Sequence, residues 1–168
     1  MKIPGKVTQI RFYKACIYLT LFVLLASCAG ARKARIRDKK IDTIIETART
    51  FTGTPYKWGG NTRTGLDCSG LTSNAYRAVN ITLPRQAAAQ AEVGEKVKIK
   101  ELHAGDLLFF ATGKKKREIT HVGIVTVVKS SDHIKFIHAS TSVGVVESNL
   151  FEDYYIKRFR LARRVITK

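Results

Sequence analysis

The chain has 168 residues, and its 30 lysines and arginines outweigh 13 aspartates and glutamates to give a formal net charge of +17. Such a basic surface favours anionic partners such as nucleic acid, anionic lipid or an acidic polymer, although a soluble protein that is merely basic has the same composition. Three cysteines provide no disulfide framework or cysteine-rich zinc site, and no recognition-helix or zinc-finger pattern supports nucleic-acid binding.

The first 27 residues have the pattern of a bacterial signal peptide. Four cations without an acid precede an apolar run of about a dozen residues, shorter than the roughly 20 that span a membrane. Small residues then precede Cys28, which resembles a lipobox, where the signal is cut before a cysteine that becomes acylated. The alternatives are an ordinary signal peptide or an uncleaved anchor with Cys28 incidental. We expect an exported protein held to a membrane by lipid on Cys28.

Removal of this signal changes both the charge and the cysteine count. Losing the four signal cations lowers the net charge from +17 to +13. Cys16 would leave with the signal and Cys28 would carry lipid, so Cys68 would be the only free thiol of the mature chain. Export argues against nucleic acid and favours the cell wall or a membrane as the anionic partner. Ala29 and Gly30 leave no acid directly after Cys28, which under a familiar bacterial sorting rule points to the outer membrane, facing the periplasm.

After Cys28 we expect a short basic tether over residues 28–40 and one domain over residues 41–168. Helical spacing predicts helices over residues 41–52, from Cys68 onward and over residues 84–92. β-branched and aromatic residues then predict five strands, over residues 106–111, 120–129, 133–139, 144–148 and 159–165. Helices followed by an antiparallel sheet of about five strands define an α+β fold.

Cys68 lies between a glycine-rich loop and a helical stripe formed by Leu71, Ala75 and Val79. This places the cysteine at or beside the first turn of a helix, where unpaired N–H groups and the positive end of the dipole favour an anion. A cysteine there is expected to lose its proton more easily, and the thiolate is the nucleophile. The alternative is an inert cysteine packed as a small hydrophobe.

Two of the four histidines are candidates for chemistry. His103 and His133 lie in turn-rich segments and are expected to be solvated. His121 and His138 lie in apolar strands, where each ring needs a partner, and Gly123 leaves space beside His121 on its face of the sheet. We expect the two rings to hydrogen-bond, one fixing the tautomer of the other. The alternatives are two satisfied core histidines or a metal pair; a metal lacks a fourth ligand, so no metal or cofactor is predicted.

A nucleophile, a base and an orienting group form a catalytic triad. In this hypothesis Cys68 attacks a carbonyl, His121 takes and returns the proton, and His138 positions His121. Backbone N–H groups at the helix start, including that of Cys68, would hold the oxyanion.

The ordered motifs resemble the NlpC/p60 family of cysteine peptidases, which have a papain-like fold and cut the peptide stems of bacterial peptidoglycan. The resemblance spans about residues 41–165, without a second domain. It implies that Cys68, His121 and His138 are catalytic, with no cofactor, and it implies substrate contacts for four further residues. The motifs are Pro55-Tyr56-Lys57-Trp58-Gly59-Gly60, Asp67-Cys68-Ser69-Gly70-Leu71, Leu83-Pro84-Arg85 with Gln90, Gly105-Asp106-Leu107-Leu108-Phe109-Phe110, His121-Val122-Gly123-Ile124 and Ile137-His138-Ala139-Ser140; the implied substrate contacts are Tyr56, Asp67, Ser69 and Arg85.

For Asp67 and Arg85 a local salt bridge or a helix cap is an equal alternative to substrate contact. Trp58 is expected in the core or in a groove wall. Residues 62–66 and 140–145 extend the resemblance to lipoprotein murein endopeptidases that cut the D-alanyl–diaminopimelate cross-link. The alternatives are cleavage at D-glutamyl–diaminopimelate, a non-catalytic wall-binding module, or a transferase or toxin with the same nucleophile. The oligomeric state is open.

Overall fold

The computed structural model describes residues 30–130 and 132–167. The predicted signal peptide and Cys28 lie outside the described residues. The chain divides into two compact units, one ending at Asp38 and one covering Lys39–Thr167. Residues 30–49 are helical, so the helix begins well before the predicted residue 41 and includes most of the segment expected as a tether. In the described part of the chain no helix is both long and apolar enough to cross a membrane.

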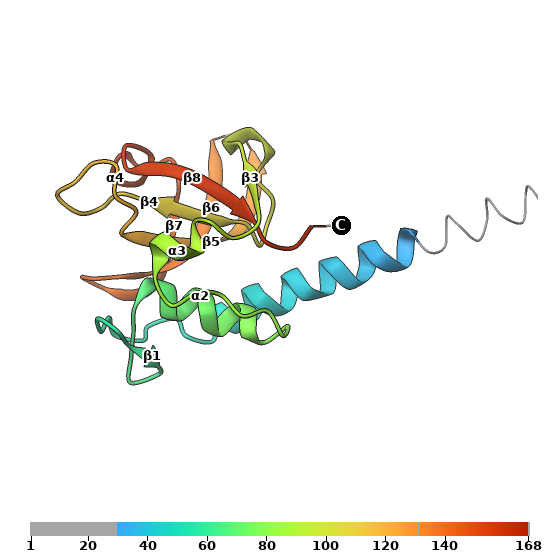
Figure 1. Ribbon diagram of the computed structural model, residues 1–168, viewed down its shortest axis with the longest axis horizontal. Coiled ribbons are helices and arrows are strands. Elements are labelled where there is room, and N and C mark those ends of the chain that lie inside the picture. Colours follow the sequence, from blue (N-terminus) through green and yellow to red (C-terminus); the bar gives the residue numbers. More distant parts are fainter. Residues whose placement is uncertain (1–29, 131, 168) are drawn as a thin grey trace, which may run out of the picture. The chain divides into compact units, whose positions relative to one another are not determined.

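The Lys39–Thr167 unit has its helices early and its strands late, as predicted (Figure 1). The α+β fold class is therefore confirmed. A short hairpin precedes the helix that begins at Cys68. Two four-residue helices lie before and within the strand region. The bounds are β1 Asn61–Thr62, β2 Gly65–Leu66, α2 Cys68–Arg77, α3 Ala87–Gln90, β3 Glu95–Val97, a 3-10 turn Ile99–Glu101, β4 Leu107–Phe110, β5 His121–Ser130, β6 His133–Ser140, β7 Gly144–Asn149, α4 Asp153–Ile156 and β8 Phe159–Arg164.

Six strands form one antiparallel sheet in the order β3-β8-β4-β5-β6-β7. The five predicted strands are all present. The sheet has one further strand, β3, which lies at one edge and was not predicted. That strand has three residues, of which Glu95 and Lys96 are exposed, so it carries no apolar pattern that reveals a strand. Its pairing with β8 is long-range, with Lys96 opposite Arg163.

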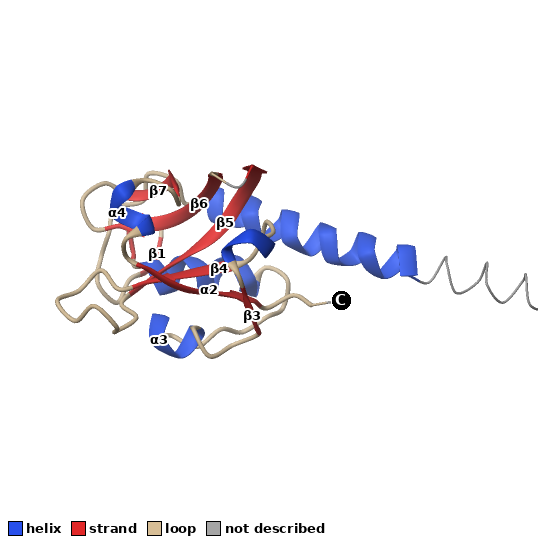
Figure 2. Ribbon diagram, turned by 90° about the horizontal axis from the view of Figure 1, so that it is seen from above, coloured by secondary structure: helices blue, strands red, loops and turns tan. Residues whose placement is uncertain are grey.

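The sheet is buried on both faces, which is clearest in β4. Leu107 and Phe109 belong to the apolar cluster that includes the helix residues Ile44 and Leu71, whereas their neighbours in β4 belong to a second cluster. Alternate residues of a strand point to opposite faces, so a strand of four consecutive apolar residues fits between two cores. Helix α2 packs on β5 and β6 on the first face, as seen from a second direction in Figure 2.

Candidate active site

Helix α2 begins at Cys68 because Asp67 caps it. The backbone of Asp67 is extended, and its Oδ1 accepts a hydrogen bond of 2.7 Å from the N–H of Gly70. A carboxylate at this position satisfies one of the unpaired N–H groups of the first turn and complements the helix dipole. The prediction that Cys68 lies in the first turn of a helix is confirmed.

The same carboxylate organises the residues around the cysteine. Asp67 accepts hydrogen bonds from Arg85 at 2.6 and 2.9 Å, from the Ser69 hydroxyl at 3.1 Å and from the Gly59 N–H at 2.9 Å. Burial alone would raise the pKa of Asp67, but the hydrogen bonds from Arg85, Gly70 and Ser69 outweigh it, and the pKa is lowered. The cap and the salt bridge are thus both present, and direct contact of Asp67 or Arg85 with substrate stays a prediction.

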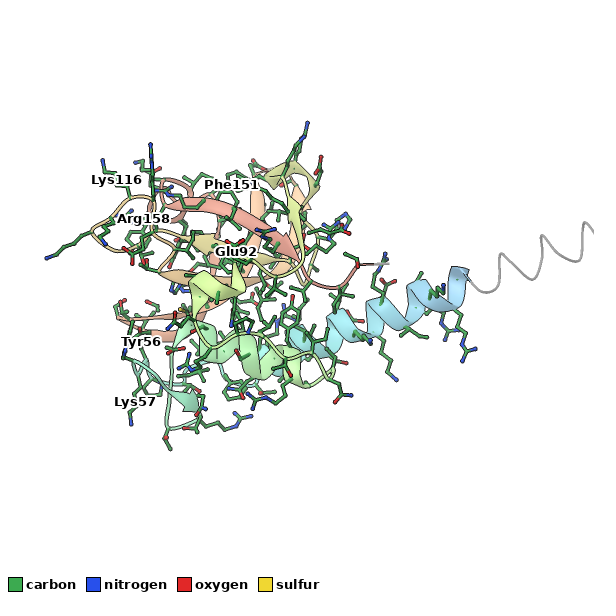
Figure 3. All side chains as sticks on the ribbon, in the orientation of Figure 1. Tyr56, Lys57, Glu92, Lys116, Phe151 and Arg158 are labelled. Carbon is green, nitrogen blue, oxygen red and sulfur yellow. The ribbon has the colours of Figure 1, made fainter. Side chains whose placement is uncertain are left out.

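The loop before the cysteine folds over this carboxylate. Gly59 has a φ of +73°, which only glycine adopts readily, and this turn presents its N–H to Asp67. Tyr56 lies half-buried in the loop, and burial, together with the nearby charges of Cys68 and Asp67, raises its pKa. Figure 3 shows Tyr56 and Lys57 beside the β1 hairpin, near the start of α2. Trp58 is 86% exposed in the turn, so it does not lie in the core, and its place in a groove wall stays a prediction.

The Cys68 side chain is free and only 7% exposed. Burial raises the pKa of its thiol, although the N–H groups of Val122, Ser69 and Cys68 itself act in the opposite direction. The sequence predicted that the helix start would lower this pKa; the prediction is wrong because desolvation of the thiolate is the larger effect. Because the Val122 N–H acts to lower the pKa of the thiol, the sulfur lies close to Val122, the residue that follows His121.

The two candidate histidines are brought together as predicted. Nε2 of His121 lies 3.0 Å from Nδ1 of His138, with the rings at 85° to each other. Burial lowers the pKa of His121 to about 4, and burial together with the charge of His121 lowers that of His138 to about 3. Both rings are therefore neutral at pH 7, and Nδ1 is the nitrogen of His121 that remains for a partner other than His138.

Gly123 provides the space that the histidine pair needs. A Cβ at this position would lie 2.6 Å from the Phe136 ring and 3.2 Å from the Cβ of His138. The Phe136 ring in turn stacks on His138 with centroids 4.8 Å apart. The prediction of open space beside His121 is wrong, because the place that a side chain at position 123 would take is filled by Phe136, the ring that supports His138.

Three residues of the site, Ser148, Tyr155 and Gln90, were not predicted from the sequence to have a role there. Ser148 and Tyr155 each place a hydroxyl oxygen 3.1 Å from Nε2 of His138. Gln90, noted only as part of a motif, is fully buried; its amide nitrogen donates to the Ser69 carbonyl at 3.2 Å and the Pro84 carbonyl at 2.8 Å. A polar residue inside an alanine-rich apolar stretch was the available signal for Gln90.

The other two histidines lie outside this group. His103 is exposed as expected, whereas His133 is half-buried at the start of β6 rather than fully solvated. Among the described residues, no group of three or more histidines, cysteines and carboxylates is arranged to hold a metal ion.

A buried cysteine at a helix start, close to the N–H of the residue that follows His121, and a hydrogen-bonded histidine pair on an antiparallel sheet are what a cysteine-dependent hydrolase of the α+β class would need. The NlpC/P60 family model matches residues 53–164. The chain therefore belongs to the NlpC/P60 family, whose members are cysteine peptidases.

The sequence relatives come from several bacteria. A probable endopeptidase, NlpC of Escherichia coli, is 38% identical over 157 residues, covering 89% of this chain and 98% of that protein. The Escherichia coli murein DD-endopeptidase MepS/murein LD-carboxypeptidase is 37% identical, covering 81% of this chain and 64% of that protein. A γ-D-glutamyl-L-lysine dipeptidyl-peptidase of Bacillus subtilis is 43% identical, covering 76% and 42%.

The fold is also that of solved NlpC/P60 proteins. The crystal structure of a family member from Bacillus cereus superposes with a TM-score of 0.68 at 33% identity, covering 76% of this chain and 40% of that chain. The match to MepS, to the dipeptidyl-peptidase and to this structure thus spans less than two thirds of each relative, whereas the match to NlpC spans almost all of it.

Proposed function

We propose that this protein hydrolyses amide bonds in the peptide stems of peptidoglycan, and that its bond is the D-alanyl–diaminopimelate cross-link. The observation that carries the proposal is the placement of Cys68 at the start of α2 beside β5, whose first residue, His121, is hydrogen-bonded to His138. The relatives named as a probable endopeptidase and as a murein DD-endopeptidase supply the substrate class.

In the proposed reaction the site begins as a neutral thiol and a neutral imidazole, since burial raises the pKa of Cys68 and lowers that of His121. The sulfur attacks the scissile carbonyl while its proton moves to Nδ1 of His121. The oxyanion forms at the start of α2, where the Cys68 N–H and the Tyr56 hydroxyl are the expected donors. His121 then gives the proton to the leaving amine, and water hydrolyses the thioester with His121 as base.

The loop that leads into β5, and so to His121, fits an anionic substrate. Lys114, Lys115, Lys116 and Arg117 are exposed in the loop that leads into β5, and Arg160 holds this loop by a hydrogen bond to the Lys116 carbonyl. In the view of Figure 3, Lys116 and Arg158 lie toward the same side of the Lys39–Thr167 unit as Tyr56 and Lys57. Stem peptides carry carboxylates that such cations attract.

We further propose that the protein acts on the wall from a membrane, anchored by lipid on Cys28 in the outer membrane and facing the periplasm. The support for the anchor is the signal and lipobox pattern of the sequence, and the support for the outer membrane is that Ala29 and Gly30 leave no acid directly after Cys28. Radiolabelled palmitate should be incorporated by the wild-type protein and not by Cys28→Ala. Equal labelling of both proteins would contradict the anchor.

A second specificity is favoured by one finding, the 43% identity to a γ-D-glutamyl-L-lysine dipeptidyl-peptidase. In this alternative, the same residues would cleave the D-glutamyl–diaminopimelate bond. Digestion of purified sacculi with the detergent-solubilised protein, followed by mass spectrometry, separates the two. Conversion of cross-linked dimers to monomeric tetrapeptides supports the DD-endopeptidase, and products cut after D-glutamate support the alternative.

Cys68→Ala is the control for this digestion, and we expect it to abolish all cleavage while leaving the fold intact, because it removes only one buried sulfur atom. Cleavage that persists in Cys68→Ala would contradict the mechanism. Absence of cleavage by the folded, reduced wild-type protein would favour a module that binds the wall without cutting it.

A further inference from the structure

We infer that Ser148 and Tyr155 are positioning residues for catalysis: their hydroxyls select the tautomer in which His121 can take the proton of Cys68. The inference rests on the proposed function, in which His121 is the base. It extends the site beyond its three proposed members to two residues on different elements, neither of which touches the reacting sulfur.

Both hydroxyls converge on the far nitrogen of His138. Nε2 of this ring lies 3.1 Å from Ser148 Oγ and 3.1 Å from the Tyr155 hydroxyl, and Ser148 donates to Tyr155 at 3.3 Å. The sheet register explains the first contact. Ser148 lies opposite Phe136, two residues from His138 on the same face, and diagonal neighbours on one face are within reach of each other.

Aromatic packing fixes the second hydroxyl. The Tyr155 ring, on helix α4, meets Phe136 edge-on at a centroid distance of 5.0 Å, Phe110 at 5.9 Å and His138 at 5.2 Å. These contacts hold the ring from several sides, so little freedom remains for the hydroxyl to leave His138. Loss of the oxygen in Tyr155→Phe would keep this packing.

The position of one hydrogen decides whether His121 can act as a base. Its Nε2 already faces His138, so only Nδ1 can accept the proton of Cys68. Nδ1 is free to do so when the ring carries its hydrogen on Nε2 and donates it to Nδ1 of His138. His138 must then carry its own hydrogen on Nε2, and that hydrogen needs an acceptor.

The two hydroxyls supply that acceptor. One N–H can be shared between two oxygens, whereas the single lone pair of an unprotonated Nε2 would engage only one of them. Ser148 uses its own hydrogen on Tyr155, which leaves its oxygen to accept from His138. The opposite arrangement would put a hydrogen on Nδ1 of His121 and remove the base. The hydroxyl pair therefore favours the active tautomer and stabilises the charge that forms when His121 is protonated.

The test compares wild type with Ser148→Ala, Tyr155→Phe and the double variant, all as full-length proteins in detergent. Tyr154→Phe is the matched control, since Tyr154 is an exposed neighbour that makes no hydroxyl hydrogen bond among the described residues. We expect each single variant to lower kcat on a cross-linked muropeptide by about 5-fold and the double variant by about 50-fold, with KM changed by less than about twofold. Ser148→Thr, which keeps the hydroxyl, should restore most of the activity.

Two readouts separate positioning from a merely structural loss. Nitrogen-15 NMR of the histidine rings should show Nδ1 of His121 unprotonated in wild type and in Tyr154→Phe, with a substantial protonated fraction in the double variant. The acid limb of kcat/KM should also move to lower pH in the double variant, because the protonated His121 loses its support. An unchanged His121 tautomer and an unchanged kcat in a folded double variant would overturn the inference.

The outcomes also distinguish this inference from the proposed function. If wild type and Cys68→Ala digest sacculi equally, the proposed mechanism fails, whatever the NMR spectra show. If wild type alone digests sacculi and the double variant matches it in kcat, tautomer and pH profile, the proposed function stands and the positioning role of Ser148 and Tyr155 is rejected.

Discussion

The two halves of the candidate site are built by different kinds of interaction. On the nucleophile side, Asp67 caps the helix that begins at Cys68, and it binds backbone or side-chain donors within eight residues of itself as well as Arg85. On the base side, His121 and His138 are connected by side chains alone to Ser148 and Tyr155. These four residues come from β5, β6, β7 and α4.

This difference determines how precisely each half is held. The nucleophile side depends on a helix start and on hydrogen bonds to a single carboxylate, so most of its geometry forms once one helix and its loop are in place. The base side depends on the register of three strands and on a helix beyond them, so it forms only when the sheet is complete. We expect damage to the first half to unfold the loop, and damage to the second to leave a folded but poorly ordered catalyst.

The largest effect is expected from Asp67→Ala, which removes the helix cap, the partner of Arg85 and the acceptor of the Gly59 N–H together. We expect a loss of about 2–4 kcal/mol in the free energy of unfolding, measured by urea denaturation, because a capping residue and a hydrogen-bonded buried carboxylate are lost at once. Activity should fall by more than about 100-fold, because the loop that carries Tyr56 is released.

Two matched variants sharpen this test. Asp67→Asn keeps an oxygen for the helix N–H groups and should recover part of the stability but not the ion pair with Arg85. Asp153→Asn removes an exposed ion pair with Lys157 and should change the stability little. If Asp67→Ala is as stable as Asp153→Asn, the nucleophile side does not depend on the carboxylate as described.

A smaller effect is expected from Gly123→Ala on the base side. The new methyl group would lie 2.6 Å from the Phe136 ring and 2.9 Å from the Ile137 carbonyl oxygen, so the ring that stacks on His138 and the β6 backbone beside it must shift. We expect a destabilisation of about 1–3 kcal/mol and a loss of kcat of about tenfold, with Cys68 still alkylated at the wild-type rate.

Gly113→Ala is the control for that variant, because its neighbour is a Thr120 methyl group at 3.3 Å in an exposed loop that can adjust. A Gly123→Ala protein with wild-type kcat would show that the histidine pair tolerates displacement, which contradicts the side-chain origin of its geometry.

The difference between local interactions and long-range contacts also explains which features could be predicted from the sequence and which could not. A helical stripe after Cys68 and the apolar strands around His121 and His138 are local patterns, and the helix start, the five longer strands and the histidine contact were all predicted from them. The short edge strand β3 has no such pattern and exists through its pairing with β8. Burial of Cys68 reversed its expected pKa shift, since desolvation depends on elements that pack on it from elsewhere in the chain.

Ser148 and Tyr155 show the same limit at the scale of single residues. A serine at the polar end of a strand and a tyrosine in a short helix carry no periodic or motif signal. Only the register of β7 on β6 and the packing of α4 bring their hydroxyls to His138. Trp58 shows the converse, because its size predicted a place in the core or in a groove wall, whereas it is exposed beside the turn at Gly59.

The smallest expected effect is on activity at mildly acidic pH, where a buried base should behave differently from a solvated one. A histidine of pKa 6.5 is only about 3% unprotonated at pH 5, so an enzyme that depends on it loses about 30-fold in kcat/KM relative to neutral pH. Burial lowers the pKa of His121 to about 4, so the loss at pH 5 should be less than about twofold, with the acid limb well below pH 6.5. The pH profile of muropeptide cleavage measures this directly.

The low pKa values of the two buried histidines should also make the free energy of unfolding depend on pH. Between pH 6.5 and pH 4 the unfolded chain binds protons at His121 and His138, while the folded chain leaves both rings neutral. The free energy of unfolding should therefore fall as the pH falls through this window, whereas above pH 6.5 the two rings contribute no pH dependence. Urea denaturation at pH 7 and pH 5 provides the measurement, and the activity assay at pH 5 must be run where the protein is still folded. An acid limb of kcat/KM near pH 6.5 in the folded protein would mean that the base is exposed to water before the substrate binds. The histidine pair would then not be desolvated by the four elements that hold it.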